Sequence, residues 1–202
     1  MGSNHDFVEL IGNWESVETE EGKTRDDDKI DFAFLELGVT ILSQLGNLKF
    51  ISNNEVLNRD LKKHEIYCSV FGYPHSKNKI KNIPKKKVKP IPFNFSSILN
   101  FEETIFEKYS YSMDSHFLLE FDHKRSKNSN GETVNSISPR GVSGGGLFLI
   151  EGMEDTSSYN FMNVPTFKLL GILIENQKHD RVLAFTKINL ILGAIHQYIR
   201  SG

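Results

Sequence analysis

Short apolar runs dominate this sequence, and their length limits the folds open to it. Nine runs of four to eight residues alternate with polar segments; they lie at 7–11, 30–37, 48–51, 66–72, 108–113, 116–121, 146–150, 168–174 and 181–186. Runs this short are typical of β-strands, because helices in globular proteins usually need about ten residues or more. The pattern therefore predicts a mainly β protein.

One segment at the C-terminal end has helical periodicity instead. Its apolar residues recur at intervals of three and four positions: Ile188, Ile191, Leu192, Ile195, Tyr198 and Ile199. This spacing predicts a helix over 187–202 that buries one face, with Thr186 as its N-cap. A shorter helical turn is predicted over 38–47.

Charge and cysteine content narrow the class of protein. The chain has 202 residues and a formal net charge of -2, so no overall field directs it toward nucleic acid or an anionic membrane. Its single cysteine, Cys68, cannot form an internal disulfide, which favours a reducing compartment. The sequence as given shows neither a signal peptide nor an apolar stretch long enough to span a membrane. We expect a cytoplasmic protein with no membrane partner.

A lysine-rich segment interrupts the apolar runs. Residues 75–92 carry seven lysines and three prolines, and we interpret them as a solvated loop. Because this segment has few aromatic residues to stack on bases, the sequence disfavours nucleic acid as a partner; a basic-loop interaction is the weaker alternative. No metal or cofactor is expected, since His64 with Cys68, and His116 with His123, lack the repeated spacing of zinc ligands.

A serine surrounded by glycines is the main candidate for chemistry. The segment "SPRGVSGGGLF" (138–148) places Ser143 directly before an apolar run. A serine hydroxyl becomes a nucleophile when a base removes its proton and fixed donors receive the charge that develops on the substrate oxygen. Flanking glycines let the N–H groups of Gly141 and Ser143 point outward as such donors. The alternative is a glycine turn before a strand; a phosphate-binding loop does not fit, because no Lys-Ser/Thr pair or helix follows.

The order of motifs along the chain adds a resemblance. "KIDFAFLEL", "VFGYP", "SPRGVSGGGLF" and "LLGILIE", followed by a C-terminal helix, resemble the chymotrypsin/trypsin-like serine peptidases, particularly the divergent bacterial intracellular type. The resemblance implies a chymotrypsin-like double β-barrel and a serine endopeptidase that cleaves protein or peptide substrates through an acyl-enzyme. It makes Ser143 the nucleophile and Asp31 the buried carboxylate that orients a histidine. Asp31 could instead be the solvated lip of its strand.

The same resemblance bears on substrate binding. Ile137, six residues before the nucleophile, falls at the floor of the family's primary pocket, and Gly144 falls beside it. These two residues imply a preference for an apolar or small side chain, unless Ile137 simply packs into the barrel. Val142 stands where the activated digestive enzymes have an Asp that pairs with a newly cut amino terminus, so activation by cleavage is not implied.

The catalytic histidine is where the match is incomplete. In the family it precedes the aspartate, and His5 is the one histidine before Asp31; it lies 26 residues upstream and lacks the usual Thr-Ala-x-His surroundings. We therefore name His5 as the base, with a mobile terminal side chain as the alternative. If the chain has no such base, it is a catalytically inactive homologue that acts as a peptide- or partner-binding module.

Strand counts divide the chain into three parts. Residues 1–60 offer about three strands where the family has six, so we predict a partial N-terminal barrel lobe there, consistent with an N-terminal truncation. Residues 61–186 carry enough strands for a complete C-terminal barrel lobe with the nucleophile loop, and 187–202 form the helix. An incomplete first barrel exposes strand edges, which predicts self-association.

Overall fold

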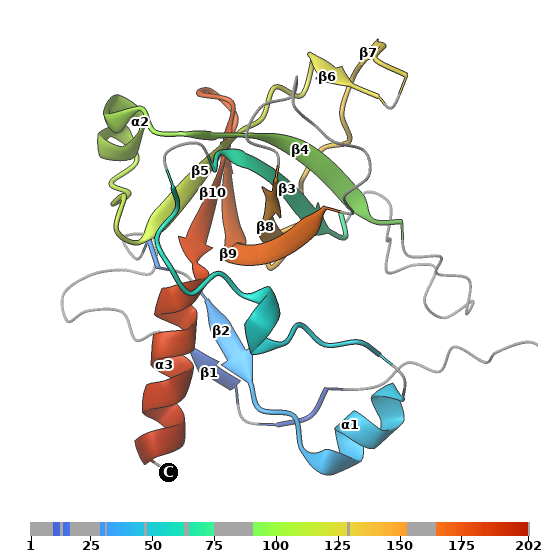
Figure 1. The fold of residues 1–202 in the computed structure, drawn as a ribbon, viewed down its shortest axis with the longest axis vertical. Helices are drawn as coiled ribbons and strands as arrows, with labels where there is room; N and C mark the ends of the chain where they lie inside the picture. The colour runs from blue at the N-terminus through green and yellow to red at the C-terminus, as the bar shows by residue number, and fades with distance from the viewer. Residues whose placement is uncertain are drawn as a thin grey trace, which may run out of the picture.

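A closed barrel of six antiparallel strands forms the body of the molecule (Figure 1). The computed structural model describes residues 10–12, 14–16, 29–30, 32–46, 48–62, 65–74, 91–128, 130–152 and 165–201. The barrel strands are β3 (Tyr67–Gly72), β4 (Phe93–Asn100), β5 (His116–Glu120), β8 (Gly146–Glu151), β9 (Thr166–Gln177) and β10 (Val182–Lys187). The expectation of a mainly β protein with a barrel and a C-terminal helix is confirmed.

The barrel consists of two three-stranded units. Strands β3, β4 and β5 pair in sequence, as do β8, β9 and β10. The pairs β3–β8 and β5–β10 then join the two units and close the sheet on itself. Because the sheet closes, each strand of the barrel is paired on both sides over at least part of its length.

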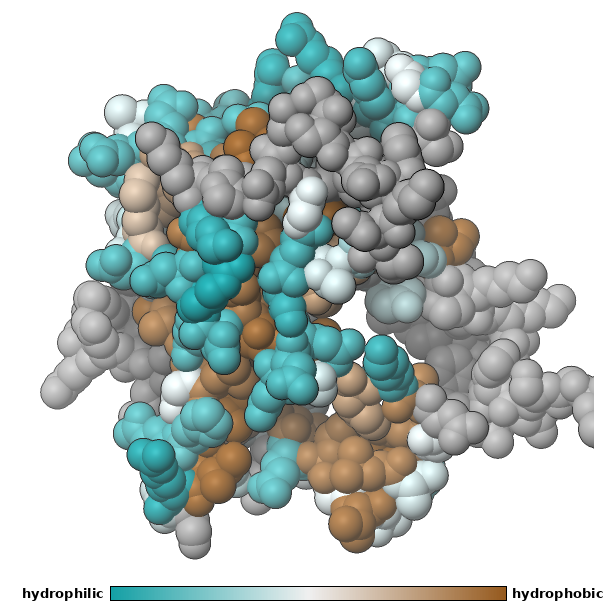
Figure 2. All heavy atoms as spheres, viewed as in Figure 1, coloured by the Kyte–Doolittle hydropathy of each residue, from teal (hydrophilic) through white to brown (hydrophobic). Residues whose placement is uncertain are grey.

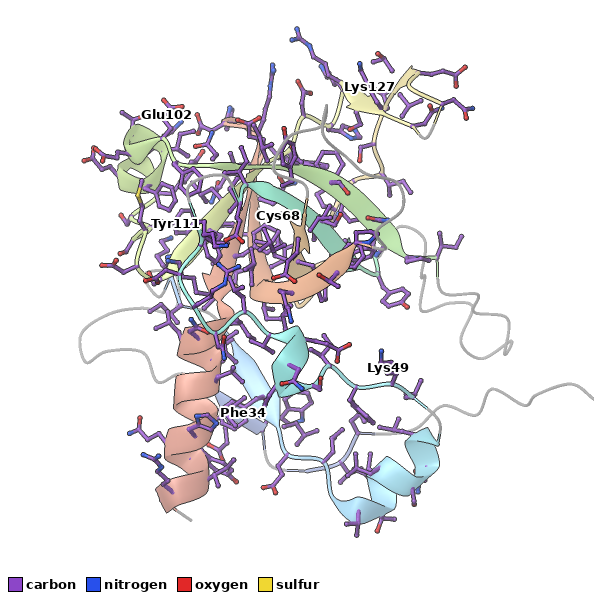
Figure 3. All side chains as sticks on the ribbon, in the orientation of Figure 1. Phe34, Lys49, Cys68, Glu102, Tyr111 and Lys127 are labelled. Atoms are coloured by element: carbon purple, nitrogen blue, oxygen red, sulfur yellow. The ribbon has the colours of Figure 1, made fainter. Side chains whose placement is uncertain are left out.

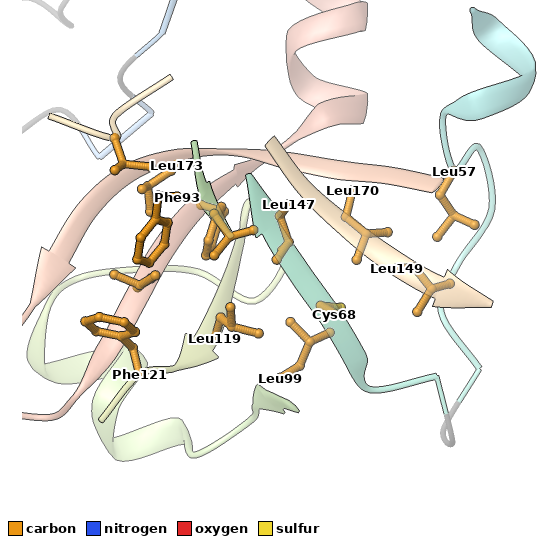
Figure 4. Packing of buried hydrophobic residues seen from close by; sticks show 14 residues of the cluster. Leu57, Cys68, Phe93, Leu99, Leu119, Phe121, Leu147, Leu149, Leu170 and Leu173 are labelled. Carbon is orange, nitrogen blue, oxygen red and sulfur yellow. The ribbon is translucent and has the colours of Figure 1, made fainter. Parts of the chain in front are cut away.

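Alternating side chains of the strands fill the barrel interior. From β8, Leu147 and Leu149 point inward beside Cys68 of β3 (Figure 4). The full set of buried core residues is Leu57, Cys68, Val70, Phe93, Leu99, Leu119, Phe121, Val142, Leu147, Leu149, Leu170, Leu173, Leu183 and Phe185. The apolar runs of the sequence thus supply the side chains that fill the barrel interior.

The short helix α2 (Glu103–Lys108) and the turn after it cover part of the outer barrel surface. Phe106 and Tyr111 pack there on Leu118 of β5 and on Ala184 of β10. Tyr111 lies on this outer side, away from Cys68 (Figure 3), and its hydroxyl donates to Glu175 Oε2 at 2.7 Å.

Helix α3 (Ile188–Ser201) closes the chain below the barrel (Figure 1). Ile188 and Ile191 pack with Phe32 and Leu169, and the rings of Phe34 and Tyr198 meet edge to face at 5.5 Å. The predicted helix is confirmed, but Thr186 is not its N-cap. The residue stays in β10, opposite His116 and Ile172, and its buried hydroxyl has no hydrogen-bond partner in the described part of the chain.

The described N-terminal residues form a small layer next to α3. Strands β1 (Trp14–Ser16) and β2 (Ala33–Leu35) pair with each other, and α1 (Val39–Leu45) confirms the helical turn predicted over 38–47. A 3-10 turn, η2 (Asn53–Glu55), leads to Leu57, whose N–H donates to the Leu169 carbonyl of β9 at 3.0 Å. Among the described residues of this region, β1 and β2 are the strands, and the run at 48–51 is not extended into a sheet. The partial first barrel remains a prediction.

Two strand assignments within the barrel region differ from the expectation. The run at 108–113 is not a strand: it contains the end of α2 and a turn in which Ser110 has a φ of 55°. Its place in the barrel is taken by β4, which the sequence analysis left out. The polar segment 122–139 carries a small hairpin of β6 (Ser126–Lys127) and β7 (Thr133–Val134). None of the helices in the described ranges is long and apolar enough to cross a membrane.

Candidate functional site

The glycine segment forms two successive turns that are fixed to strand β9. The Val142 N–H donates to the Pro139 carbonyl at 2.9 Å, and the Gly145 N–H donates to the Val142 carbonyl at 2.7 Å. Two further bonds join the segment to Leu173, from Gly144 N to Leu173 O at 2.9 Å and from Leu173 N to Gly145 O at 2.8 Å. Backbone hydrogen bonds therefore hold Ser143 in a defined position.

Three of the glycines are required by this geometry. Gly141 and Gly144 have φ angles of 82° and 87°, in the left-handed region that side chains disfavour. At Gly145 the constraint is space, because a Cβ atom would lie 2.5 Å from the Phe71 carbonyl oxygen. The run of glycines is thus a structural requirement of the turns and of their approach to β3.

The buried side chain of Val142 fixes the loop to the barrel core. Its side chain is buried in the barrel core and lies against Gly72, where an added Cβ would be 2.4 Å from Val142 Cγ1. Val142 therefore holds the loop in place by packing, whereas the activated digestive enzymes have an Asp at this position that forms an ion pair.

Ser143 itself is exposed, on the turn above the buried valine. Its Oγ donates to the carbonyl oxygen of Ile174 on β9 at 3.4 Å, a long and therefore weak hydrogen bond. Within the described ranges, the N–H groups of Gly141 and Ser143 donate no hydrogen bond. An accessible hydroxyl and two unused main-chain donors thus share one turn, as an oxyanion-binding site requires.

The structure does not place the other two predicted catalytic residues. His5 and Asp31 both lie outside the described residues. On either side of Asp31, Phe32 packs into the cluster under α3, and the carbonyl of Lys29 accepts a hydrogen bond from His116 Nε2 at 2.7 Å. Lys29 and Phe32, the described residues before and after it, therefore contact the outside of the barrel and the cluster under α3.

His116 is a buried histidine to which the sequence analysis gave neither a metal-binding nor a catalytic role. Its Nδ1 accepts from Ser115 Oγ at 2.8 Å and from the Ser112 N–H at 3.4 Å, so both ring nitrogens are engaged. Burial lowers the pKa of its imidazole, which favours the neutral form. Its role is to join β5 to the N-terminal segment, and it is not free to act as a base for Ser143. The sequence signal was its position between a serine-rich turn and a buried strand.

The predicted substrate-binding residues behave differently from each other. Ile137 is half-buried and packs against the barrel core, which favours the alternative that it is a packing residue. Gly144 lies in the turn with its N–H already bonded to Leu173, and no atom lies within 4 Å of the place where its Cβ would be.

Strand β9 extends past its neighbour at this site. Its pairing with β8 ends at Ile172 opposite Gly146, and the glycine turns then contact Leu173. Beyond that point β9 continues to Gln177, paired with β10 on its other side. The last residues of β9 therefore have no partner on β8, although Leu173 is buried and bonded to the glycine turns and Ile174 is half-buried.

The part of the chain that the structure describes contains no group of three or more His, Cys, Asp or Glu residues arranged to bind a metal ion. Cys68 lies in the core, where burial raises the pKa of its thiol to about 12. A comparison of the chain with protein-family models, curated proteins and solved structures found no match.

Proposed function

We propose that this protein is a serine endopeptidase-like hydrolase with Ser143 as its nucleophile. The observation that supports this most is the turn at 141–145, in which an exposed hydroxyl sits beside the unused N–H groups of Gly141 and Ser143. Donors fixed in advance at the place where charge develops are the largest single contribution in many acyl-transfer enzymes.

In the proposed reaction, Ser143 Oγ attacks the carbonyl carbon of a peptide bond while a base takes its proton. The N–H groups of Gly141 and Ser143 bind the oxyanion. The C–N bond then breaks, the base returns the proton to the leaving amine, and an ester remains on Oγ. Water attacks this ester, gives its proton to the base, and releases the acid as Oγ regains a proton.

The remaining parts of the machinery are assigned by resemblance. His5 is the proposed base and Asp31 the carboxylate that orients it and stabilises its protonated form. We also propose that residues 1–60 form a partial N-terminal barrel lobe of the chymotrypsin-like double barrel, and that the protein acts in the cytoplasm on protein or peptide substrates.

A catalytically inactive peptide-binding homologue is the second candidate. It is favoured by the absence of any imidazole hydrogen-bonded to Ser143 within the described ranges, together with the end of β9 that extends beyond its pairing with β8. A peptide can add to such a strand through main-chain hydrogen bonds without any reaction.

Covalent labelling tests the nucleophile and separates the two candidates. A fluorophosphonate should modify the wild type and Ser138→Ala, a control from the same loop, but not Ser143→Ala. Equal labelling of wild type and Ser143→Ala would disprove the assignment. Hydrolysis of fluorescein-labelled casein that is lost in Ser143→Ala supports the enzyme. Peptide binding that Ser143→Ala retains, with no hydrolysis by the wild type, supports the binding module.

A further inference from the structure

A cavity lies at the end of the barrel where the β5–β6 and β9–β10 connections meet. It has a volume of about 560 Å³ and is bounded by residues 121–125, by the 178–181 turn, and by Ser138, Pro139 and Asn176. Both connections are at the upper end of the barrel in Figure 1, and the described atoms at this end are mostly hydrophilic (Figure 2).

The lining of this cavity carries an excess of positive charge. Among the described residues that line it, one is acidic, Asp122, and four are cationic, which gives a formal charge of +3 with the histidines neutral; the cations are Lys124, Arg125, Lys178 and Arg181. His123 and His179 also line it. Asp180, the other acid of the turn, does not line this cavity, because its carboxylate accepts hydrogen bonds from Lys108 and Tyr109 on the α2 side.

The carboxylate of Asp122 contacts two of the four cationic side chains and one backbone N–H group. Its Oδ2 accepts from Arg181 Nη1 at 2.9 Å and lies 3.9 Å from Arg125 Nε, and its Oδ1 accepts from the Lys124 N–H at 2.9 Å. Arg181 uses one nitrogen of its guanidinium in these contacts, and its other N–H groups donate to no group among the described residues. The side chain of Arg181 is 60% exposed, so it can reach into the cavity.

The backbone of Arg181 is also specialised. Its φ is 54°, in the region that favours glycine, and its carbonyl accepts from the Phe121 N–H at 2.6 Å. A residue with a long cationic side chain therefore occupies a turn position where glycine would be less strained. That choice is explained if the guanidinium is needed at this place.

Asn176 supplies a further polar group. Asn176 is one of the lining residues, and its Oδ1, which is buried from solvent, accepts no hydrogen bond from the described residues.

We infer that this cavity is a binding site for a phosphate monoester. Guanidinium groups match the oxygens of a phosphate in geometry. The formal charge of +3 on the described lining residues favours a ligand with two negative charges, such as a phosphate monoester, over a carboxylate with one. The inference does not depend on the proposed chemistry of Ser143, although Ser138 and Pro139 of the same loop border the cavity.

Titration calorimetry with inorganic phosphate, at constant ionic strength set by chloride, tests this site. We expect saturable binding to one site per chain. Arg181→Gly should weaken it about fivefold, the loss of one charge-assisted hydrogen bond in a screened position, and Lys178→Gln should also weaken it. Because glycine suits the positive φ, misfolding would not explain the loss. Lys49→Gln, which removes an exposed charge at the other end of the molecule (Figure 3), should bind as the wild type does.

Absence of saturable binding, unchanged binding in Arg181→Gly and Lys178→Gln, or an equal loss in Lys49→Gln would each overturn the inference. A phosphoserine tripeptide and its unphosphorylated form then identify the source of the ligand. Binding of the phosphorylated peptide at least about tenfold tighter than inorganic phosphate would indicate a phosphorylated peptide, and equal binding would indicate a small phosphate monoester.

Discussion

Replacing Gly145 by alanine tests whether the shape of the nucleophile loop is fixed by backbone contact. The added Cβ would lie 2.5 Å from the Phe71 carbonyl oxygen, 0.9 Å less than the 3.4 Å of an ordinary contact, and 2.9 Å from the Val142 carbonyl oxygen. Neither atom can move freely, because Phe71 is paired with Gly146 in the barrel and the Val142 carbonyl closes the turn. We expect Gly145→Ala to lower the free energy of unfolding by about 3 kcal/mol, at the upper end of the range for overpacking.

Gly144→Ala is the matched control for this substitution. It has an unfavourable φ of 87° but no atom within 4 Å of its Cβ, so its cost should be about 1 kcal/mol. Urea unfolding followed by circular dichroism measures both, and fluorophosphonate labelling of Ser143 should fall in Gly145→Ala. If Gly145→Ala is as stable as Gly144→Ala, the loop is not held by these contacts and the reasoning is wrong.

Three further predictions concern other parts of the molecule. Hydrogen bonds from Arg59, and to a smaller extent from the Lys62 N–H, lower the pKa of Glu65 from 4.5 to about 2. The ionised carboxylate therefore stabilises the fold fully above pH 4.5, and this stabilisation is lost as the pH falls toward 2; the loss in unfolding free energy, measured against pH, should be smaller in Arg59→Gln than in the wild type. The Cys68 thiol should react with Ellman's reagent in urea but not in the native state, where fast reaction would contradict its burial. Val39 on α1 is 82% exposed, and an exposed apolar residue of this kind can mediate the predicted self-association. Light scattering should then show a dimer that Val39→Asp converts to a monomer; a monomeric wild type would rule this out.

The barrel could be predicted largely from the sequence because apolar runs of strand length are a local signal. Five of its six strands coincide with predicted runs, since each buries at least one face. The miss at β4 has a physical reason: Ser96 and Ser97 dilute its alternation, although Phe93 and Leu99 are buried. The false strand at 108–113 alternates tyrosines, but these cover the outside of the barrel through contacts to Asp180 and Glu175 that sequence spacing does not reveal.

The candidate site could be predicted only in its local part. The turn of Ser143 depends on neighbouring glycines, so its position could be inferred from a short motif. The burial of Val142 and the packing of Ile137 depend on how the loop meets β3 and the core, which no local pattern encodes. The cationic cavity joins residues from 121 to 181 across a chain reversal, and their separation in sequence concealed it.

The central claim is that the Ser143 hydroxyl faces main-chain donors able to hold an oxyanion. Nuclear magnetic resonance of the protein with phenylboronic acid tests it most directly, because a boronate that bonds to the serine oxygen becomes tetrahedral and carries the negative charge of the reaction intermediate. The account predicts a tetrahedral boron signal that Ser143→Ala abolishes, together with downfield shifts of the Gly141 and Ser143 amide protons. A boron signal that persists in Ser143→Ala, or amide protons that do not move when the adduct forms, would contradict it.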